Sequence, residues 1–456
     1  MKNSSTVRTD ELFGEMGLTV RPNPAKIAES VILTLLKMRE KNRLIERELL
    51  KTVEKYLPQR EYLAVVGPRQ AGKTTLLEML QKTHPEASYL TFEDRKVLAL
   101  FEEDIDSFIS LYCQKEKLLL VDEFQYAKNG GKNLKYIFDT VKGLKIVITG
   151  SSSLELKANV GKYMVGRIFF FNLWPLSFAE FLSFKDKKLF ELYRKKRFDF
   201  EKPPTVVAEL QNDPLSSHFL PLCEDYLAFG GYPRAAMVED EEEKKTVLGN
   251  VVSTYLLRDV KGLLQIENEV SYLKLISALA LQIGNLYNLK ELSNTTKLDY
   301  RQLVSYLDAL RQTFIIEDLS PFYTNPRTEM TKTPKAYFLD LGLRNATIDN
   351  FVSPEKRADC GALAENFVFN SLSRANFKIN FWRTKSKAEI DFVIRCGEKT
   401  IPCEVKYQTG FASIPKSFYG FSEKYNFPFG LVVTRDMIGA KRINGKTLFF
   451  YPIYLL

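Results

Sequence analysis

Short apolar runs alternate with stretches of helical spacing along the first half of the chain. The runs are rich in aliphatic and β-branched residues, as buried parallel strands are, and they cover residues 62–66, 89–92, 118–121 and 145–150. Residues 75–80, which follow the first run, place apolar side chains at helical intervals. This alternation predicts an α/β fold with a parallel sheet, and it places the ligand site at the carboxyl ends of the strands.

The loop after the first predicted strand has the pattern G-x-x-x-x-G-K-[ST], which is typical of a phosphate-binding loop. The two glycines let the backbone curl so that its N–H groups point at phosphate oxygens, and the positive end of the next helix faces the same point. The lysine is expected to reach the β- and γ-phosphates of ATP, and the threonine hydroxyl to bind Mg²⁺. The predicted nucleotide-binding residues are Gly67, Pro68, Arg69, Gln70, Ala71, Gly72, Lys73, Thr74 and Thr75.

Polar residues follow two further predicted strands. Asp122 and Glu123 end the third strand in a Walker B pattern. Asp122 is expected to hold Mg²⁺, directly or through water, and Glu123 to orient or deprotonate the attacking water. The fourth strand ends in a polar tip, where Ser151 or Ser152 is expected to contact the γ-phosphate or the water; the sequence does not choose between them.

These segments together resemble a known family. The runs GPRQAGKTTLL, LLLVDEFQYA, TGSSSLEL, VGRIFFFNLWPLSFAEFL and YLAFGGYPRAA are similar to those of prokaryotic AAA+-type ATPases that carry a C-terminal nuclease-like domain. The resemblance extends from about residue 58 over nearly the whole chain, and it implies that an arginine completes the nucleotide site. Arg167 and Arg234 are the two candidates, and each is equally well explained by a structural salt bridge.

The pattern divides the chain into five predicted parts. They are an N-terminal flexible segment and helix (1–57), a P-loop ATPase core (58–221), a helical lid over the nucleotide (222–265), a winged helix (266–340) and a PD-(D/E)xK nuclease-like domain (341–456). Residues 185–215 are charged and contain proline, so a loop-rich link is expected there.

Three helical segments followed by two short apolar strands predict the winged helix. The helices are expected at residues 270–283 and 289–292 and after Asp299, which has the position of an N-cap. The exposed face of the third helix offers the polar residues Arg301, Gln302, Ser305, Asp308 and Arg311. That face is weakly basic, so both DNA reading and packing between two enzymatic domains remain open.

A charged hairpin is predicted in the last quarter of the chain. Asp391 lies near the start of one strand, whereas Glu404 and Lys406 lie two residues apart on the next and therefore share a face. Together with Glu365 on an upstream helix, this D-x₁₂-E-x-K arrangement resembles the PD-(D/E)xK nuclease core. The resemblance implies that Glu365, Asp391 and Glu404 hold Mg²⁺ and that Lys406 stabilises or activates the attacking water. Many members of that superfamily keep the fold as a binding module, and an exposed charged hairpin is the plain alternative.

Composition narrows the class of protein. The chain has 456 residues and a net charge of +9, and residues 355–456 hold 16 Lys and Arg against 9 Asp and Glu. This basic region points to nucleic acid or, equally, to a solvated basic surface. Five scattered cysteines and two histidines argue against a disulfide framework and against zinc hydrolases. No membrane span or apolar signal core is recognised, so a cytoplasmic protein is expected.

Two hypotheses remain at this point. The first is an ATP-hydrolysing enzyme coupled to a C-terminal domain that binds DNA, with cleavage of that DNA left open. The second is a non-cleaving switch in which ATP controls binding to DNA or to a protein partner. A small-molecule phosphotransferase is disfavoured by the basic C-terminal third. The expected ligands are ATP, Mg²⁺ and DNA, no membrane partner is expected, and assembly into a homo-oligomer is left open.

Overall fold

The computed structural model describes residues 44–114, 117–151, 156–204, 209–259, 268–323, 329 and 332–456. The predicted flexible segment, most of the first predicted helix, Ser152 and the end of the predicted lid lie outside these ranges. None of the described helices is both long enough and apolar enough to cross a membrane.

A five-stranded parallel sheet forms the first structural layer, in the strand order β2-β3-β4-β1-β5. Its strands are β1 (Tyr62–Val66), β2 (Ser88–Thr91), β3 (Leu118–Asp122), β4 (Lys145–Gly150) and β5 (Ile168–Asn172). The surrounding helical segments are α2 (Glu48–Tyr56), α3 (Lys73–Thr83), α4 (Arg95–Glu103), α5 (Ile105–Tyr112), η1 (Phe124–Tyr126), α6 (Gly130–Thr140) and η2 (Lys157–Gly161). The predicted parallel α/β fold is confirmed, with β5 as an additional strand.

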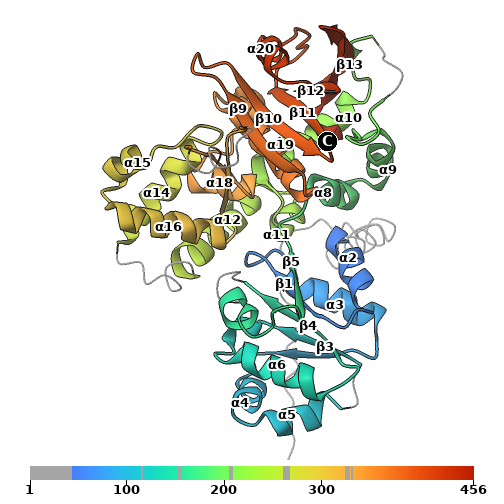
Figure 1. Cartoon of the computed structure of the whole chain (residues 1–456), viewed down its shortest axis with the longest axis vertical. Helices are drawn as coiled ribbons and strands as arrows, with labels where there is room; N and C mark the ends of the chain where they lie inside the picture. The colour runs from blue at the N-terminus through green and yellow to red at the C-terminus, as the bar shows by residue number, and fades with distance from the viewer. Residues whose placement is uncertain are drawn as a thin grey trace, which may run out of the picture. The chain divides into compact units, whose positions relative to one another are not determined.

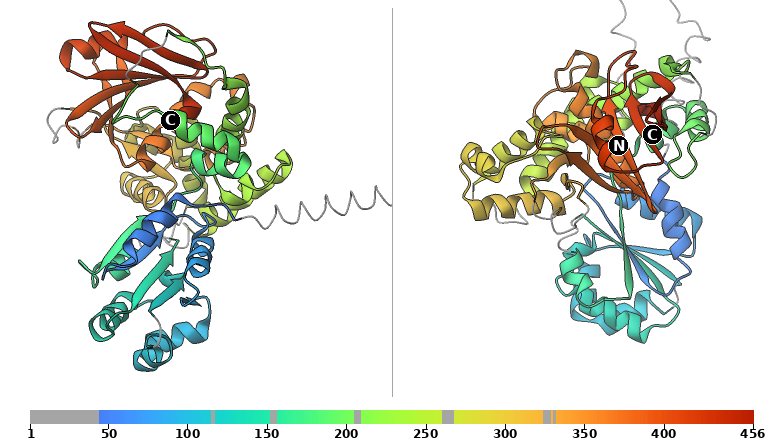
Figure 2. Two further views of the ribbon diagram at one scale, coloured as in Figure 1. Left: turned by 90° about the vertical axis from the view of Figure 1, so that its right-hand side faces the viewer. Right: turned by 45° about the horizontal axis from the view of Figure 1, so that its top comes forward.

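Both faces of this sheet are covered, because side chains alternate between two cores. Leu63 and Val65 of β1 pack with Leu76 and Leu77 of α3. The intervening residue Ala64 joins the core on the opposite face, which contains residues of α6. Figure 2 shows helices on both sides of these strands. A strand that is buried on both faces reads as a continuous apolar run, which is the pattern of the sequence.

A group of helices follows the sheet. They are α8 (Phe178–Lys185), α9 (Lys187–Lys196), α10 (Ser216–Phe229), α11 (Pro233–Ala236), α12 (Glu241–Val251) and the π-helix η3 (Val252–Asp259). Ser177 begins α8 with a complete capping box, in which its side chain and that of Glu180 bond to each other's backbone N–H. The segment predicted as a lid contains helices where the structure describes it, and α10 and α12 pack against a later helix, α18 (Leu341–Thr347).

Three helices and a two-stranded antiparallel sheet come next: α14 (Glu269–Leu281), α15 (Leu289–Thr296), α16 (Tyr300–Gln312), β7 (Ile316–Leu319) and β8 (Lys335–Phe338). We call this group the three-helix module. Asp299 caps α16 as predicted, through a capping box with Gln302. The apolar run that predicts the first of these strands begins at Phe314, but β7 starts only at Ile316, because Phe314 has a φ of 60°, which is outside the strand region.

The C-terminal part is a seven-stranded mixed sheet in the order β6-β13-β14-β12-β11-β10-β9. Its elements are η4 (Pro354–Lys356), α19 (Cys360–Arg374), β9 (Lys378–Arg383), β10 (Glu389–Cys396), β11 (Lys399–Lys406), α20 (Ser417–Lys424), β12 (Phe429–Thr434), β13 (Met437–Ile443), β14 (Lys446–Pro452) and η5 (Ile453–Leu455). They are orange to red in Figure 1. The predicted hairpin is the antiparallel pair β10–β11.

Part of the segment predicted to belong with the ATPase core packs on this C-terminal sheet. The short strand β6 (Gln211–Asn212) pairs with β13, and the Phe198 N–H donates to the Leu455 carbonyl. Phe219 stacks on Tyr454 with ring centroids 5.0 Å apart. The sequence boundary at residue 221 therefore does not separate these two parts, because β6 and α10 supply an edge strand and a helix to the C-terminal core.

Gly342 lies where α18 approaches the end of α10, and Gly249 of α12, which faces open space, provides a control. A Cβ on Gly342 would stand 2.0 Å from the Phe229 carbonyl oxygen, whereas one on Gly249 in α12 would have no heavy atom within 4 Å. We expect Gly342→Ala to lower the free energy of unfolding by about 3 kcal/mol, as overpacking does. Gly249→Ala should raise it by about 0.5–1 kcal/mol through helix propensity. Thermal or denaturant unfolding checks both variants, and equal effects would show that the contact is not tight.

Candidate functional site

The predicted phosphate-binding loop lies between β1 and α3, at the carboxyl end of the sheet. Gly72 has a φ of 94° directly before the helix, a conformation that favours glycine. Lys73 is 5% exposed, and its Nζ donates to the carbonyl oxygens of Gly67 and Pro68, each at 3.1 Å. Burial lowers the pKa of Lys73 to about 8, although the charges of Glu123 and Asp122 act in the opposite direction.

Asp122 joins four elements at this edge of the sheet. Its Oδ2 accepts hydrogen bonds from the Thr74 hydroxyl at 2.6 Å and from the Tyr89 hydroxyl at 3.0 Å. Its Oδ1 accepts from the Thr149 hydroxyl. The predicted pair of Mg²⁺ ligands, Thr74 and Asp122, is thus brought into direct contact. Hard oxygen donors from a hydroxyl and a carboxylate fit Mg²⁺.

Glu123 follows Asp122 in a left-handed conformation, with a φ of 54°. Its N–H donates to the Thr149 hydroxyl at 3.1 Å, and its carboxylate accepts a hydrogen bond from the Gln125 amide. The same amide donates to Ser151 Oγ at 3.2 Å. Ser151, one of the two residues predicted at the tip of the fourth strand, is therefore linked to Glu123 through Gln125.

The two candidate arginines lie at different places. Arg167 precedes β5, and its carbonyl accepts from the N–H of Tyr62, the first residue of β1. It therefore lies at the amino ends of the strands, opposite the phosphate-binding loop of the same chain, and it pairs with Asp139 at 3.6 Å. Arg234 is exposed in α11 and pairs with Glu243 at 3.6 Å. Its neighbour Pro233 has a side-chain atom 3.9 Å from the Cβ position of Gly72, so α11 begins beside the loop.

Four residues that contact the site are absent from the sequence predictions. Arg47 is 6% exposed and donates to the Ala71 carbonyl at 2.5 Å, to the Trp174 carbonyl at 2.5 Å and to Glu180 at 3.1 Å. Its guanidinium thus holds the backbone of the phosphate-binding loop. The others are Tyr89, Thr149 and Gln125. A threonine and a tyrosine on otherwise apolar strands were the available signals for two of them; no signal marked Arg47.

The four residues predicted for the nuclease-like site come close together. Glu365 lies on α19, Asp391 on β10, and Glu404 and Lys406 on β11. Lys406 Nζ is 2.6 Å from Glu404 Oε1, and the Val405 N–H donates to Asp391 Oδ2 at 2.8 Å. Burial, then the charge of Glu365, raises the pKa of Asp391 well above its ordinary value.

A lysine from the three-helix module enters this cluster. Lys335 of β8 is 1% exposed and pairs with Glu365 at 2.9 Å and with Glu389 at 2.6 Å. Within the described ranges, no three or more His, Cys, Asp or Glu side chains form a group that could hold a metal ion. Lys335 thus pairs with Glu365, one of the carboxylates that the nuclease resemblance assigns to Mg²⁺.

The predicted DNA-reading face of α16 is only partly available. Arg301 and Ser305 are exposed, but Arg311 pairs with Asp308 at 2.5 Å and with Asp318 at 2.7 Å. Tyr287 also donates to Asp318 at 2.9 Å. Arg311, one of the two arginines of that face, therefore forms ion pairs within the three-helix module.

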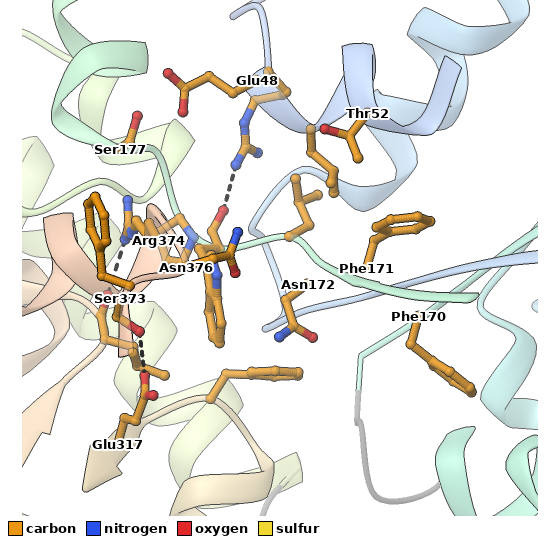
Figure 3. A pocket seen from close by; sticks show the side chains of 18 of the residues that line it. Glu48, Thr52, Phe170, Phe171, Asn172, Ser177, Glu317, Ser373, Arg374 and Asn376 are labelled. Carbon is orange, nitrogen blue, oxygen red and sulfur yellow. Dashed lines mark hydrogen bonds between the residues drawn. The ribbon is translucent and has the colours of Figure 1, made fainter. Parts of the chain in front are cut away.

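A separate cavity of about 980 Å³ is lined by residues of α2, β5, α16, β7 and the end of α19. Figure 3 shows Ser373 turned toward Glu317, to which its hydroxyl donates at 3.1 Å. Arg374 donates to the Leu339 carbonyl at 3.3 Å. Burial raises the pKa of Glu317. The cavity contains side chains of both charges and several aromatic rings, so its lining does not define one class of ligand.

Three family models match successive parts of the chain. Residues 59–182 match the family model of an AAA domain, residues 220–353 a domain of unknown function (DUF8612) and residues 360–455 another (DUF4143). An uncharacterized protein of Methanocaldococcus jannaschii is 28% identical over 83% of this chain and 81% of its own, and one of Haemophilus influenzae is 26% identical over 76% and 83%. The Walker-type ATPase PABY2304 of Pyrococcus abyssi is 16% identical, with a TM-score of 0.45 over 67% of this chain and 96% of its own. The family-model match supports an AAA domain at residues 59–182.

The buried ammonium of Lys73 gives a prediction about stability without nucleotide. Its pKa of about 8 is below the ordinary value, so the unfolded chain binds more protons between about pH 8 and pH 10. The Lys73 contribution is therefore unfavourable below pH 8 and is relieved as the pH rises. We expect Lys73→Met to raise the nucleotide-free melting temperature at pH 7 and to reduce the gain between pH 7 and pH 10.

Lys82 provides the control, because it is exposed on the same helix. Lys82→Met should leave both the melting temperature and its pH dependence nearly unchanged. A Lys73→Met chain that melts below the wild type at pH 7 would show that the two carbonyl contacts outweigh the cost of burial.

Proposed function

We propose that the P-loop part of this chain binds and hydrolyses ATP with Mg²⁺, and that its turnover controls the C-terminal part, which handles DNA. The observation that carries the ATPase proposal is the 2.6 Å hydrogen bond between Thr74 and Asp122 beside the buried ammonium of Lys73. Phosphate-binding backbone, cation and metal ligands therefore converge at one edge of the sheet.

Each residue has a distinct part in this proposal. Lys73 exchanges two carbonyl contacts for the β- and γ-phosphates. Thr74 and Asp122 would hold Mg²⁺, which supplies positive charge against the phosphates when it is bound. Glu123 orients or deprotonates the attacking water, and its bond from Gln125 fixes the direction of the carboxylate. Ser151, linked to the same amide, lies where a γ-phosphate contact is expected.

The arginine that completes the site stays open between the two candidates. Arg234 is favoured within one chain, because α11 begins beside Gly72. Arg167 would reach a nucleotide only in a neighbouring copy, since it lies at the amino ends of the strands. A homo-oligomer would be required for that second arrangement.

The test of the ATPase proposal separates binding from turnover. Glu123→Gln keeps the shape of the side chain but removes the charge that handles the water, so ATP should still bind while its hydrolysis falls about 100-fold or more. Lys73→Ala removes a phosphate contact and should weaken ATP binding itself. Calorimetric ATP binding and phosphate release measure the two effects. The exposed Glu86 gives a matched control, Glu86→Gln, which should behave as wild type. Undiminished turnover by Glu123→Gln would remove Glu123 from this role.

The DNA proposal rests on the excess of basic residues in the last quarter of the chain. Lys385 and Lys387 are exposed in the turn between β9 and β10, directly before the strand that carries Asp391. Exposed lysines of this kind bind phosphates and release counterions, which makes affinity depend on salt. A non-cleaving switch that binds a protein partner is the second candidate, and it is favoured by the use of Arg311 inside the three-helix module.

A charge-reversal experiment decides between DNA and a protein partner. We expect the full chain to bind duplex DNA with an affinity that falls steeply with salt. The double variant Lys385→Glu, Lys387→Glu should weaken binding and lower the salt slope by about two. The control Lys195→Glu, Lys196→Glu makes the same charge change at the exposed end of α9. DNA binding that is independent of salt, or equal losses in both double variants, would count against this surface.

A further inference from the structure

The carboxylate cluster of the C-terminal part contains four acidic side chains from three elements. Glu365 comes from α19, Glu389 and Asp391 from β10, and Glu404 from β11. Carboxylates gathered in this way repel one another unless a cation compensates them. In the nuclease fold that the sequence resembles, a divalent metal would serve this purpose.

Here the compensating cation is part of the chain. Lys335 Nζ lies 2.9 Å from Glu365 Oε1 and 2.6 Å from Glu389 Oε1, and it is 5.4 Å from the centre of the Phe381 ring. Two carboxylates from different elements, α19 and β10, therefore share this one ammonium.

The backbone fixes this lysine in place. Lys335 is the first residue of β8, where it pairs with Leu319 of β7 and also forms a bridge with Leu286. Tyr337, two residues further along the same strand, donates its hydroxyl to Glu365. Residues two apart on a strand share a face, so β8 presents a cation and a hydroxyl to one carboxylate.

Several carboxylate oxygens of the cluster already have partners inside the protein. Glu404 receives Lys406 Nζ on Oε1 and the Ser417 hydroxyl on Oε2. Asp391 Oδ2 accepts the Val405 N–H at 2.8 Å. Mg²⁺ requires near-octahedral oxygen coordination and gives up its water reluctantly. A dication at Glu365 would also be repelled by the Lys335 ammonium, which pairs with that carboxylate.

We propose that Lys335 is the built-in cation of this cluster and takes the place of a divalent metal, so that the C-terminal domain does not cleave nucleic acid by metal-assisted hydrolysis. The three-helix module is thereby tied to α19 and β10 through ion pairs. This inference concerns only the cluster and holds independently of whether the P-loop hydrolyses ATP or DNA is the partner.

The test uses the full chain without nucleotide, in a Thr74→Ala background that removes a metal ligand of the P-loop. Thermal unfolding is followed as MnCl₂ is added. The background chain should show no shift of melting temperature with Mn²⁺. Lys335→Met keeps the length of the side chain but leaves Glu365 and Glu389 without their shared cation. Its melting temperature should fall and should then rise again with Mn²⁺.

Lys244 provides a matched control, because it is also a buried lysine, 4% exposed, that pairs with Asp225 at 2.5 Å away from the cluster. Lys244→Met should be destabilised without recovery by Mn²⁺. Equal responses of the Lys335→Met and Lys244→Met chains to Mn²⁺ would overturn the proposal.

A second measurement needs no lysine variant and remains informative if Lys335→Met fails to fold. Electron paramagnetic resonance should detect no bound Mn²⁺ in the Thr74→Ala chain. Bound Mn²⁺ that Asp391→Asn removes, or Mn²⁺-dependent cleavage of labelled DNA that Asp391→Asn abolishes, would show that the cluster is a metal site and would overturn the proposal.

Discussion

The hydrogen bonds of one carboxylate determine the geometry of the P-loop part. Asp122 accepts from Thr74, Tyr89 and Thr149, which come from α3, β2 and β4. These elements meet at the carboxyl edge of the sheet only because β3 lies between β2 and β4. Thr149 also accepts the N–H of Glu123, so the hydroxyl that holds Asp122 holds the next residue as well. The positions of Asp122, the proposed metal ligand, and of Glu123, the proposed water-handling residue, are thus coupled.

Buried charge is balanced differently at the P-loop, around Lys73, and in the C-terminal cluster, around Lys335. At the P-loop a cation is buried beside backbone carbonyls, and burial lowers the pKa of Lys73 to about 8. Such a site gains when anionic phosphates arrive. In the C-terminal cluster the carboxylates already surround Lys335, whose pKa is raised. By our proposal, that cluster has little to gain from a further cation. The first centre would then bind a ligand, and the second would hold the structure together.

Features contained in one short stretch of sequence could be predicted. Features that depend on contacts between segments far apart in the sequence could not. The P-loop, Asp122, Glu123 and the β10–β11 hairpin are each contained in one short stretch whose periodicity is clear. The role of Thr149 depends on the strand order β3-β4, and that of Lys335 on the contact between β8 and α19, neither of which a periodic pattern encodes. Lys335 pairs with two carboxylates of the C-terminal cluster, yet it lies 56 residues before Asp391 in a different predicted domain.

Arg47 shows how a residue outside every motif constrains the nucleotide site. Its three contacts use separate nitrogens of one planar guanidinium, which holds the Ala71 carbonyl, the Trp174 carbonyl and Glu180 in fixed relation. The Trp174 ring in turn packs edge-on against Phe314, which follows α16, with centroids 5.1 Å apart. The loop that contains Ala71 is the proposed phosphate-binding loop. Any shift of its backbone must be matched at Glu180 and Trp174, or it must break a buried charged hydrogen bond. The loop is therefore held from outside its own motif, by a side chain that also contacts the residues between β5 and α8.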